Sequence, residues 1–292
     1  MASAEFLQYI VAGLKSGAIY ALVALGFTLV YGSTGIINFA QGEFFMLGGM
    51  LSVFFHGLGL PLPLAGLAGV ATTAAVGVAF ERVALRPRRD AGPLVLIIIT
   101  IGGSMVLKSL ARHVFGPNEA SLPEFTPGPS FDIAGVAIER QALWVWGVTL
   151  VIVVALWWLY RRTKFGRAMR ACSLSHDAAR LMGIDTARIV MVSFGLAAVI
   201  GALAGLVVTP LTQTSWDVGA TIGLKGFAAA ILGGLGNPVA SVVGGLVLGL
   251  LESLSIAFIS STYKDAISLL VLLIVLFWRP QGLFGRSRRE KL

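Results

Sequence analysis

Apolar residues occur in long runs along this chain, and short polar segments separate the runs. They cover about 8–31, 36–55, 62–80, 144–160, 189–209, 238–258 and 266–278, and a further run precedes Arg112. Most are close to the ~20 residues that a helix needs to cross a bilayer, and they exceed the length of membrane-barrel strands. The pattern therefore predicts an all-α, polytopic transmembrane helical bundle.

Composition supports a membrane location. Hydrophobic residues make up 57% of the 292 residues and charged residues only 12%, whereas a soluble domain carries roughly 25% charged residues. A soluble fold would have no room to bury this much apolar surface. The segment Met1–Gln8 lacks the positively charged start of a secretory signal, so we expect the first apolar run to remain in the mature protein.

Other features of the composition argue against competing classes of protein. The net charge of +8 does not indicate nucleic-acid binding, because that function needs a basic face on a soluble module. The single cysteine, Cys172, can form neither an intrachain disulfide nor a thiolate metal site by itself. His56, His113 and His176 are scattered, so we expect no metal site.

Lysine and arginine gather in three clusters that set the orientation of the chain. Sixteen of the 22 basic residues lie within 82–89, 161–188 and 279–291. The positive-inside rule places all three clusters on the cytoplasmic side. Residues of about 113–141 hold four carboxylates and several prolines between two apolar runs. We expect this segment to be an external loop, either a docking surface or an ordinary solvated connection.

The number of crossings follows from parity. Two cytoplasmic clusters must be separated by an even number of spans, but only three clear runs lie between 188 and 279. We therefore expect a fourth span at Thr221–Gly236, which is short and ends in glycines before Pro238. Short, Gly- or Pro-interrupted helices of this kind line transport pathways. The total is about nine spans, or eight if an early segment is re-entrant, in one domain over 1–292.

The cytoplasmic segment of about 161–188 is too long for a tight turn between helices. Its first part is basic, and Asp177–Met182 is suited to a short helix that ends with Gly183 at the C′ position. Such a helix on the membrane surface fits the groove of a partner protein. Alternatively, its Arg and Lys side chains anchor the loop to anionic lipid.

The chain carries an ordered series of motifs: 166–172 with 178–185, Tyr31-Gly32 with 37–43, 81–87, 232–236 with Gly244-Gly245, 263–265 and 280–283. Together they resemble the motifs of the branched-chain amino-acid ABC transporter permeases of the LivH type. The resemblance covers nearly the whole chain. One departure is Gln41, where many relatives have histidine.

The resemblance implies a permease that works with two cytoplasmic ATP-binding subunits, a second related permease and an extracytoplasmic substrate-binding protein. It implies an ATPase-coupling role for one set of residues: Thr163, Gly166, Arg167, Arg170, Ala178, Ala179, Gly183 and Ile184. No Gly-x-x-x-x-Gly-Lys-Ser/Thr sequence occurs, so we expect this chain to bind no ATP and no other cofactor.

Polar residues at membrane depth mark candidate pathway positions, because buried charges are costly unless they are paired or hydrated. A zwitterionic amino acid needs donors and acceptors, and helix ends at breaks supply both. The candidates near the two breaks are Asn38, Gln41, Glu43, Gly233, Gly234, Gly236 and Asn237. For Lys15 and Lys108 we expect snorkelling or an interhelical ion pair, and Glu252 is a possible partner of Lys225.

Two other functions compete with an ATP-driven importer in the bacterial inner membrane. A self-sufficient secondary transporter or channel would carry relays of buried acids and histidines, which are sparse here. An intramembrane enzyme would need a nucleophile–base pair or metal ligands at depth, and the sequence holds no such motif. The substrate stays open between branched-chain or other small amino acids and urea, amides or aromatic acids.

Overall fold

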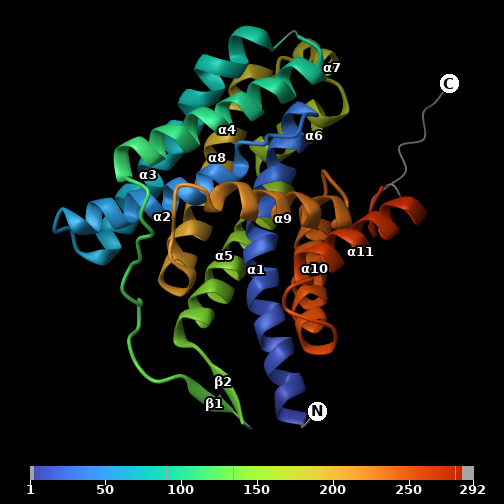
Figure 1. Cartoon of the computed structure of the whole chain (residues 1–292). Coiled ribbons are helices and arrows are strands. Elements are labelled where there is room, and N and C mark those ends of the chain that lie inside the picture. Colours follow the sequence, from blue (N-terminus) through green and yellow to red (C-terminus); the bar gives the residue numbers. More distant parts are fainter. Residues whose placement is uncertain (1–2, 90, 134, 280, 285–292) are drawn as a thin grey trace.

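A computed structural model describes residues 3–89, 91–133, 135–279 and 281–284 (Figure 1). Its long helices are α1 (Ser3–Thr34), α2 (Gln41–Gly57), α3 (Leu62–Phe80), α4 (Pro93–Phe115), α5 (Arg140–Arg162), α8 (Thr186–Thr212), α9 (Val218–Gly233), α10 (Pro238–Phe258) and α11 (Lys264–Trp278). Short elements are η1 (Glu81–Leu85), η2 (Arg86–Arg88), α6 (Lys164–Leu174), α7 (His176–Leu181), β1 (Phe131–Ile133) and β2 (Val136–Ile138).

The structure confirms the all-α membrane bundle. Within the described residues, six helices are long and apolar enough to cross a bilayer: α1, α3 with its extension to Arg88, α4, α5, α8 and α10. Helices α2, α9 and α11 are shorter, with 17, 16 and 15 residues. Helix α9 occupies the place where parity requires a fourth span, but with 16 residues it is one of the shorter apolar helices, so the number of crossings between 188 and 279 stays a prediction.

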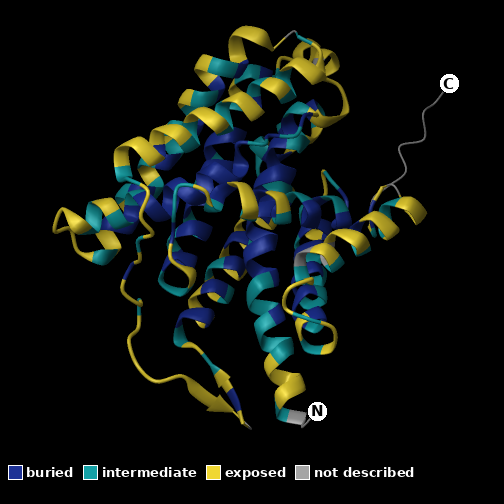
Figure 2. Ribbon diagram, viewed as in Figure 1, coloured by how far each residue is buried: buried dark blue, intermediate teal, exposed yellow. Residues whose placement is uncertain are grey.

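Helix α1 lies at the centre of the bundle, and α10 packs along it. Glycines allow this approach: a Cβ atom on Gly245 would lie 2.5 Å from the backbone nitrogen of Ala21. Buried residues gather in the central helices, whereas α4 and α11 present many exposed side chains (Figure 2). The exposed side chains of α4 are largely apolar, as a lipid-facing or subunit-facing helix requires.

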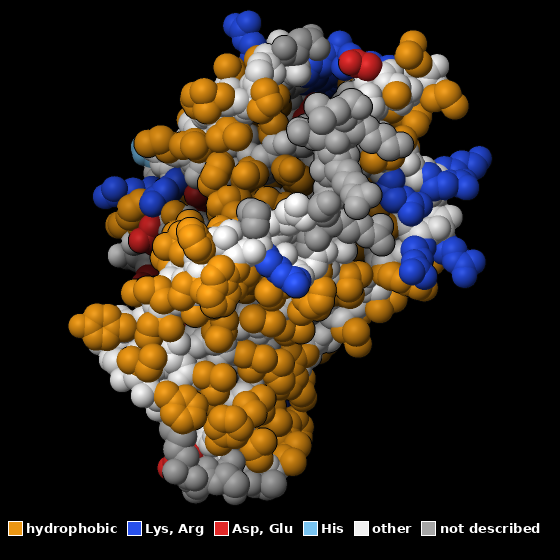
Figure 3. Space-filling model, turned by 90° about the vertical axis from the view of Figure 1, so that its right-hand side faces the viewer, with side chains coloured by type: hydrophobic (Ala, Val, Ile, Leu, Met, Phe, Trp, Pro, Cys, Tyr) orange, Lys and Arg blue, Asp and Glu red, His pale blue; other side chains and the backbone are white. Residues whose placement is uncertain are grey.

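The two ends of the bundle differ in the way that the charge pattern predicts. The start of α1 lies beside the β1–β2 hairpin at one end, and α6 and α7 lie at the other (Figure 1). Gln8 on α1 exchanges two hydrogen bonds with the backbone of Ala137, each 3.0 Å long. Lys and Arg side chains gather in the upper half of the molecule, above a broad hydrophobic surface (Figure 3).

Two details differ from the sequence-based expectation. The external segment contains a small antiparallel hairpin, in which Phe131 pairs with Ile138, and the apolar pattern gave no sign of it. The second span begins at Gln41 instead of Ile36. Gly35 adopts a left-handed φ of 72°, and the Asn38 side chain accepts a hydrogen bond from the Ala40 nitrogen. These two features turn the chain before the helix starts.

Candidate functional site

Helix α6 is fixed to the end of α5 by two of the predicted coupling residues. Thr163 Oγ1 accepts a hydrogen bond from the Gly166 nitrogen at 3.0 Å, which caps α6. A Cβ atom on Gly166 would lie 2.6 Å from the Cα of Tyr160, so only glycine permits this contact. Met169 and Cys172 are buried on the same face of α6, whereas Arg167 and Arg170 are exposed on the other.

Helix α7 ends as the sequence predicts. Gly183 has a φ of 79°, and the Ile184 nitrogen donates a hydrogen bond to the Ala179 carbonyl at 3.0 Å. This pairing is the C-terminal signature of a helix that stops at a left-handed glycine. Ala178 is exposed and Ala179 is buried, so α7 rests on the bundle by one narrow face.

Three exposed apolar side chains on this cytoplasmic segment were not predicted from the sequence. Leu174, Leu181 and Met182 are 75%, 89% and 83% exposed. With Arg167 and Arg170 they form what we call the coupling surface. Large apolar residues in a loop that is otherwise polar were the available signal, because such side chains on a soluble surface mark binding sites.

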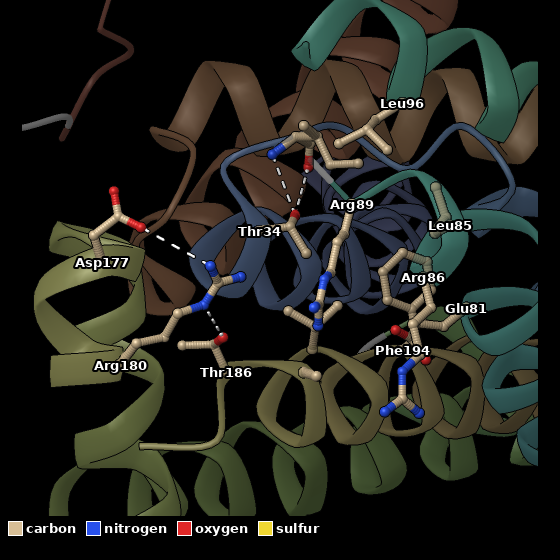
Figure 4. Close-up of a pocket in the computed structure, with 13 residues that line it drawn as sticks. Thr34, Glu81, Leu85, Arg86, Arg89, Leu96, Asp177, Arg180, Thr186 and Phe194 are labelled. Carbon is tan, nitrogen blue, oxygen red and sulfur yellow. Dashed lines mark hydrogen bonds and ion pairs between the residues drawn. The ribbon is translucent and has the colours of Figure 1, made fainter. Parts of the chain in front are cut away.

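A cavity of about 250 Å³ lies behind α7, at the cytoplasmic end of the bundle (Figure 4). We call it the inner cavity. Its lining comes from the end of α1, the basic turn after α3, α7 and the start of α8, and includes Thr34, Glu81, Arg86, Arg89, Asp177 and Arg180. Arg180 Nε donates a hydrogen bond to Thr186 Oγ1 at 3.1 Å. Residues of α7 and of the first basic cluster thus line the same cavity.

The predicted pathway residues of the first break lie together at the start of α2, fully buried. Gln41 Nε2 donates to the Ala197 carbonyl at 3.0 Å, and Glu43 Oε1 accepts from Ser104 Oγ at 2.9 Å. Each of the three retains a buried polar atom without a hydrogen-bond partner in the described structure: Asn38 Nδ2, Gln41 Oε1 and Glu43 Oε2. Such atoms are uncommon in proteins and point to strain or function.

The predicted residues of the second break form the turn between α9 and α10, apart from the first group. Gly234 and Gly236 have left-handed φ values of 126° and 88°. Asn237 caps α10 by accepting a hydrogen bond from the Ala240 nitrogen. Gly233 is packed against α10, and its carbonyl accepts a hydrogen bond from the Phe284 nitrogen. This turn therefore lies at the cytoplasmic end, beside the last described residues.

The charged residues at membrane depth have partners. Lys225 Nζ lies 2.8 Å from Glu252 Oε1, which confirms the pairing considered from the sequence. Lys15 pairs with Glu139 at 2.8 Å. The ammonium of Lys108 lies over the Trp216 ring, 4.9 Å from its centroid, a cation–π contact that the sequence did not indicate.

Candidate metal ligands are scattered in the part of the chain that the structure describes. No three His, Cys, Asp or Glu residues are grouped closely enough to hold a metal ion within the described ranges.

The sequence of this chain is similar to those of known membrane transport proteins. A family model described as "Branched-chain amino acid transport system / permease component" matches residues 9–276. The chain is 36% identical to the high-affinity branched-chain amino acid transport system permease protein LivH of Escherichia coli K12, over 98% of both proteins. It is 34% identical to the corresponding protein BraD of Pseudomonas aeruginosa, over 99% of this chain and 98% of BraD.

A more distant relative is the ribose import permease protein RbsC of Escherichia coli K12. It is 26% identical, over 89% of this chain and 82% of RbsC. The extent of the family match and the identity to LivH and BraD lead to one conclusion: the chain belongs to the family of permease components of branched-chain amino acid transport systems.

Proposed function

We propose that this chain imports branched-chain amino acids across a bacterial inner membrane by alternating access. As a member of this family it is a membrane-spanning ABC transporter permease, a transporter and not an enzyme, and such permeases work with ATPase partners. The printed names of LivH and BraD support branched-chain amino acids as substrates. Urea, amides and aromatic acids are the alternatives to test.

The observation that carries the proposal is the coupling surface. Exposed Leu181 and Met182 stand at the end of a short helix on the cytoplasmic side, and the preceding helix α6 carries two exposed arginines. A helix with apolar anchors and basic neighbours suits the groove of a partner better than it suits solvent. The proposed partners are two ATP-binding subunits here, a second related permease beside this one and a substrate-binding protein outside. ATP is bound by the partners and not by this chain.

The inner cavity supports a route by which partner motion reaches the bundle. Arg180 on α7 bonds to Thr186 at the start of α8, and both line the same cavity as Thr34 of α1. A shift of α7 would alter the packing of two spanning helices at once. The cavity provides the space for that shift, because a fully packed region resists it.

Asn38, Gln41 and Glu43 are the proposed polar positions of the pathway. Their unpartnered buried atoms offer donors and acceptors without first breaking a protein hydrogen bond. Gly233, Gly234, Gly236 and Asn237 form the proposed cytoplasmic end. Because a helix terminus exposes backbone groups, this turn can offer carbonyl oxygens to an ammonium group as the substrate leaves.

Reconstitution tests this proposal. The chain is co-expressed with its neighbouring subunits, and uptake of labelled leucine into proteoliposomes is measured with ATP and the loaded binding protein. ATP-dependent uptake, competed by isoleucine and valine but not by urea, is expected. Uptake by this chain alone without ATP would instead establish a secondary transporter.

Variants of the coupling surface add a second test. Leu181→Ser with Met182→Ser should abolish ATP-driven uptake and release the ATPases on purification, since the apolar contact is lost. Leu58→Ser is the matched control, because Leu58 is 66% exposed at the opposite end of the bundle. Full uptake by the double variant would refute the assignment of this surface.

A further inference from the structure

A second cavity opens between α9, α10 and α11 and contains a buried ion pair. We call it the α9 cavity. Its volume is about 310 Å³, at the lower end of the ~300–1,000 Å³ usual for small-molecule sites. Lys225 and Glu252 line it, with side chains that are 17% and 8% exposed. Leu224, Leu248 and Leu269 supply most of the remaining wall.

The ion pair is held by a third group from α1. Tyr20 Oη donates a hydrogen bond to Glu252 Oε2 at 2.7 Å and accepts one from Lys225 Nζ at 3.2 Å. Lys264 of α11 adds a second ammonium, 4.0 Å from Glu252 Oε1. The tyrosine contacts both charged side chains, so it can keep each in place when the direct pair separates.

This cavity adjoins a polar cavity at the external end of α9. The external cavity has a volume of about 260 Å³, and its lining includes Glu119, Asp217 and Thr221. Thr221 also lines the α9 cavity. Thr221, Lys225 and Ala228 follow at helical spacing on one face of α9, which leads from the external end to the ion pair.

We propose that the α9 cavity binds the transported amino acid, with its ammonium on Glu252, its carboxylate on Lys225 and its apolar side chain among Leu224, Leu248 and Leu269. The inference rests on the proposed function and goes beyond it by locating a substrate site. The external cavity is the entrance. Neither cavity is lined by the residues at the start of α2 that the sequence singles out.

Charge balance explains why a zwitterion is the matching ligand. Separating a buried ion pair is costly, because each charge loses its partner in an apolar surrounding. A zwitterion restores a counter-ion to both side chains when it inserts between them. A simple amine or a simple carboxylate restores only one and leaves the other without compensation. The same pair closes on itself after the substrate leaves, so neither Lys225 nor Glu252 lacks a counter-ion in the empty state.

The main competing explanation is a structural ion pair that only joins α9 to α10. Thiol protection distinguishes the two roles. Thr221→Cys is introduced with Cys172→Ala into the complete transporter in right-side-out vesicles, and a membrane-impermeant methanethiosulfonate is added outside. Thr221 is exposed, so the substitution leaves the packing intact. Ser130→Cys in the exposed external loop is the control position.

The ligands compared are leucine, 4-methylpentanoate and isopentylamine, which share the branched chain but differ in charged groups. We expect saturating leucine to slow modification of the thiol at position 221 several-fold, with no effect of the other two. No ligand should protect position 130. Glu252→Gln in the same background should remove the protection, and the comparison of ligands decides the matter even if that variant is unstable.

Equal protection by all three ligands, no protection by leucine, or a thiol that the reagent never reaches would each overturn the inference. Leucine uptake by the wild-type complex is measured in parallel. ATP-driven uptake without protection would reject the α9 cavity as the substrate site and leave the proposed function standing. Absence of branched-chain amino acid uptake by the wild-type complex would reject the proposed function itself.

Discussion

Gly233 and Gly244 face each other across α9 and α10 with no room for a side chain. A Cβ atom on Gly244 would lie 2.8 Å from the Cα of Gly233, closer than any real Cβ contact. Close backbone approach of this kind replaces the hydrophobic effect as the force between helices in a membrane. Through this contact the short α9 is fixed to the longer α10.

Gly244→Val should therefore destabilise the bundle. The added side chain would clash with backbone atoms, which cannot move aside by changing rotamer. We therefore expect the free energy of unfolding to fall by about 1–3 kcal/mol. Thermal unfolding in mild detergent, followed by tryptophan fluorescence, measures the change. Gly147→Val is the matched control, since a Cβ atom there meets nothing within 4 Å. Equal melting temperatures for the two variants would contradict the packing argument.

Arg167→Ala with Arg170→Ala should uncouple transport without unfolding the chain. Both side chains are exposed on α6, so their removal should change the free energy of unfolding by less than about 0.5 kcal/mol. We expect uptake to be lost, while membrane insertion and melting temperature stay unchanged. Lys164→Ala, a neighbouring exposed cation on the same helix, serves as control. Unimpaired uptake by the double variant would remove the arginines from the coupling role.

Glu43→Gln should lower the rate of uptake by about tenfold or more, because a hydrogen bond to a charged group contributes about 1.5–3 kcal/mol. The substitution keeps the shape of the side chain beside Ser104 and replaces the carboxyl group with an amide. Initial rates in proteoliposomes measure the effect at constant amounts of assembled complex. Glu5→Gln, at the exposed start of α1, should transport at the wild-type rate. A wild-type rate for Glu43→Gln would exclude a role for this carboxylate in the pathway.

Cys172 should react slowly with alkylating reagents. Burial on the inner face of α6 leaves its residue 1% exposed and raises the pKa of the thiol, so less thiolate is present near neutral pH. Maleimide labelling should be slow in mild detergent, faster at higher pH and complete after denaturation. Ser173→Cys, with Cys172→Ala, should label rapidly, because Ser173 is exposed. Rapid labelling of native Cys172 would show that α6 does not stay docked.

The apolar runs and the basic clusters predicted most spans and their direction. The run 238–258 matches α10 at both ends, and the parity argument located α9 to within three residues at each end. The stop of α7 at Gly183 was also predictable, since only glycine adopts that conformation readily. These features are local, or follow from the bilayer acting equally on every segment.

Contacts between segments that are distant in the sequence could not be predicted from apolar runs and charge clusters. No periodicity brings Trp216 over the ammonium of Lys108, or Tyr20 between Lys225 and Glu252. The start of α2 was misplaced by five residues because apolar Ile36 and Ile37 continue the hydrophobic run through the turn. The exposure of Leu181 and Met182 was equally hidden, since sequence does not show which face of a short helix remains uncovered.

The sequence by itself determined that this protein is a helical membrane permease, because the lack of water in a bilayer forces each apolar run to satisfy its own backbone as a helix. It also predicted which loops face the cytoplasm. Only the tertiary structure decided which polar groups meet inside the bundle. These contacts join residues as far apart in the sequence as Tyr20 and Glu252. They depend on the rotation and spacing of the helices, which are set by close glycine contacts and cannot be read from hydropathy.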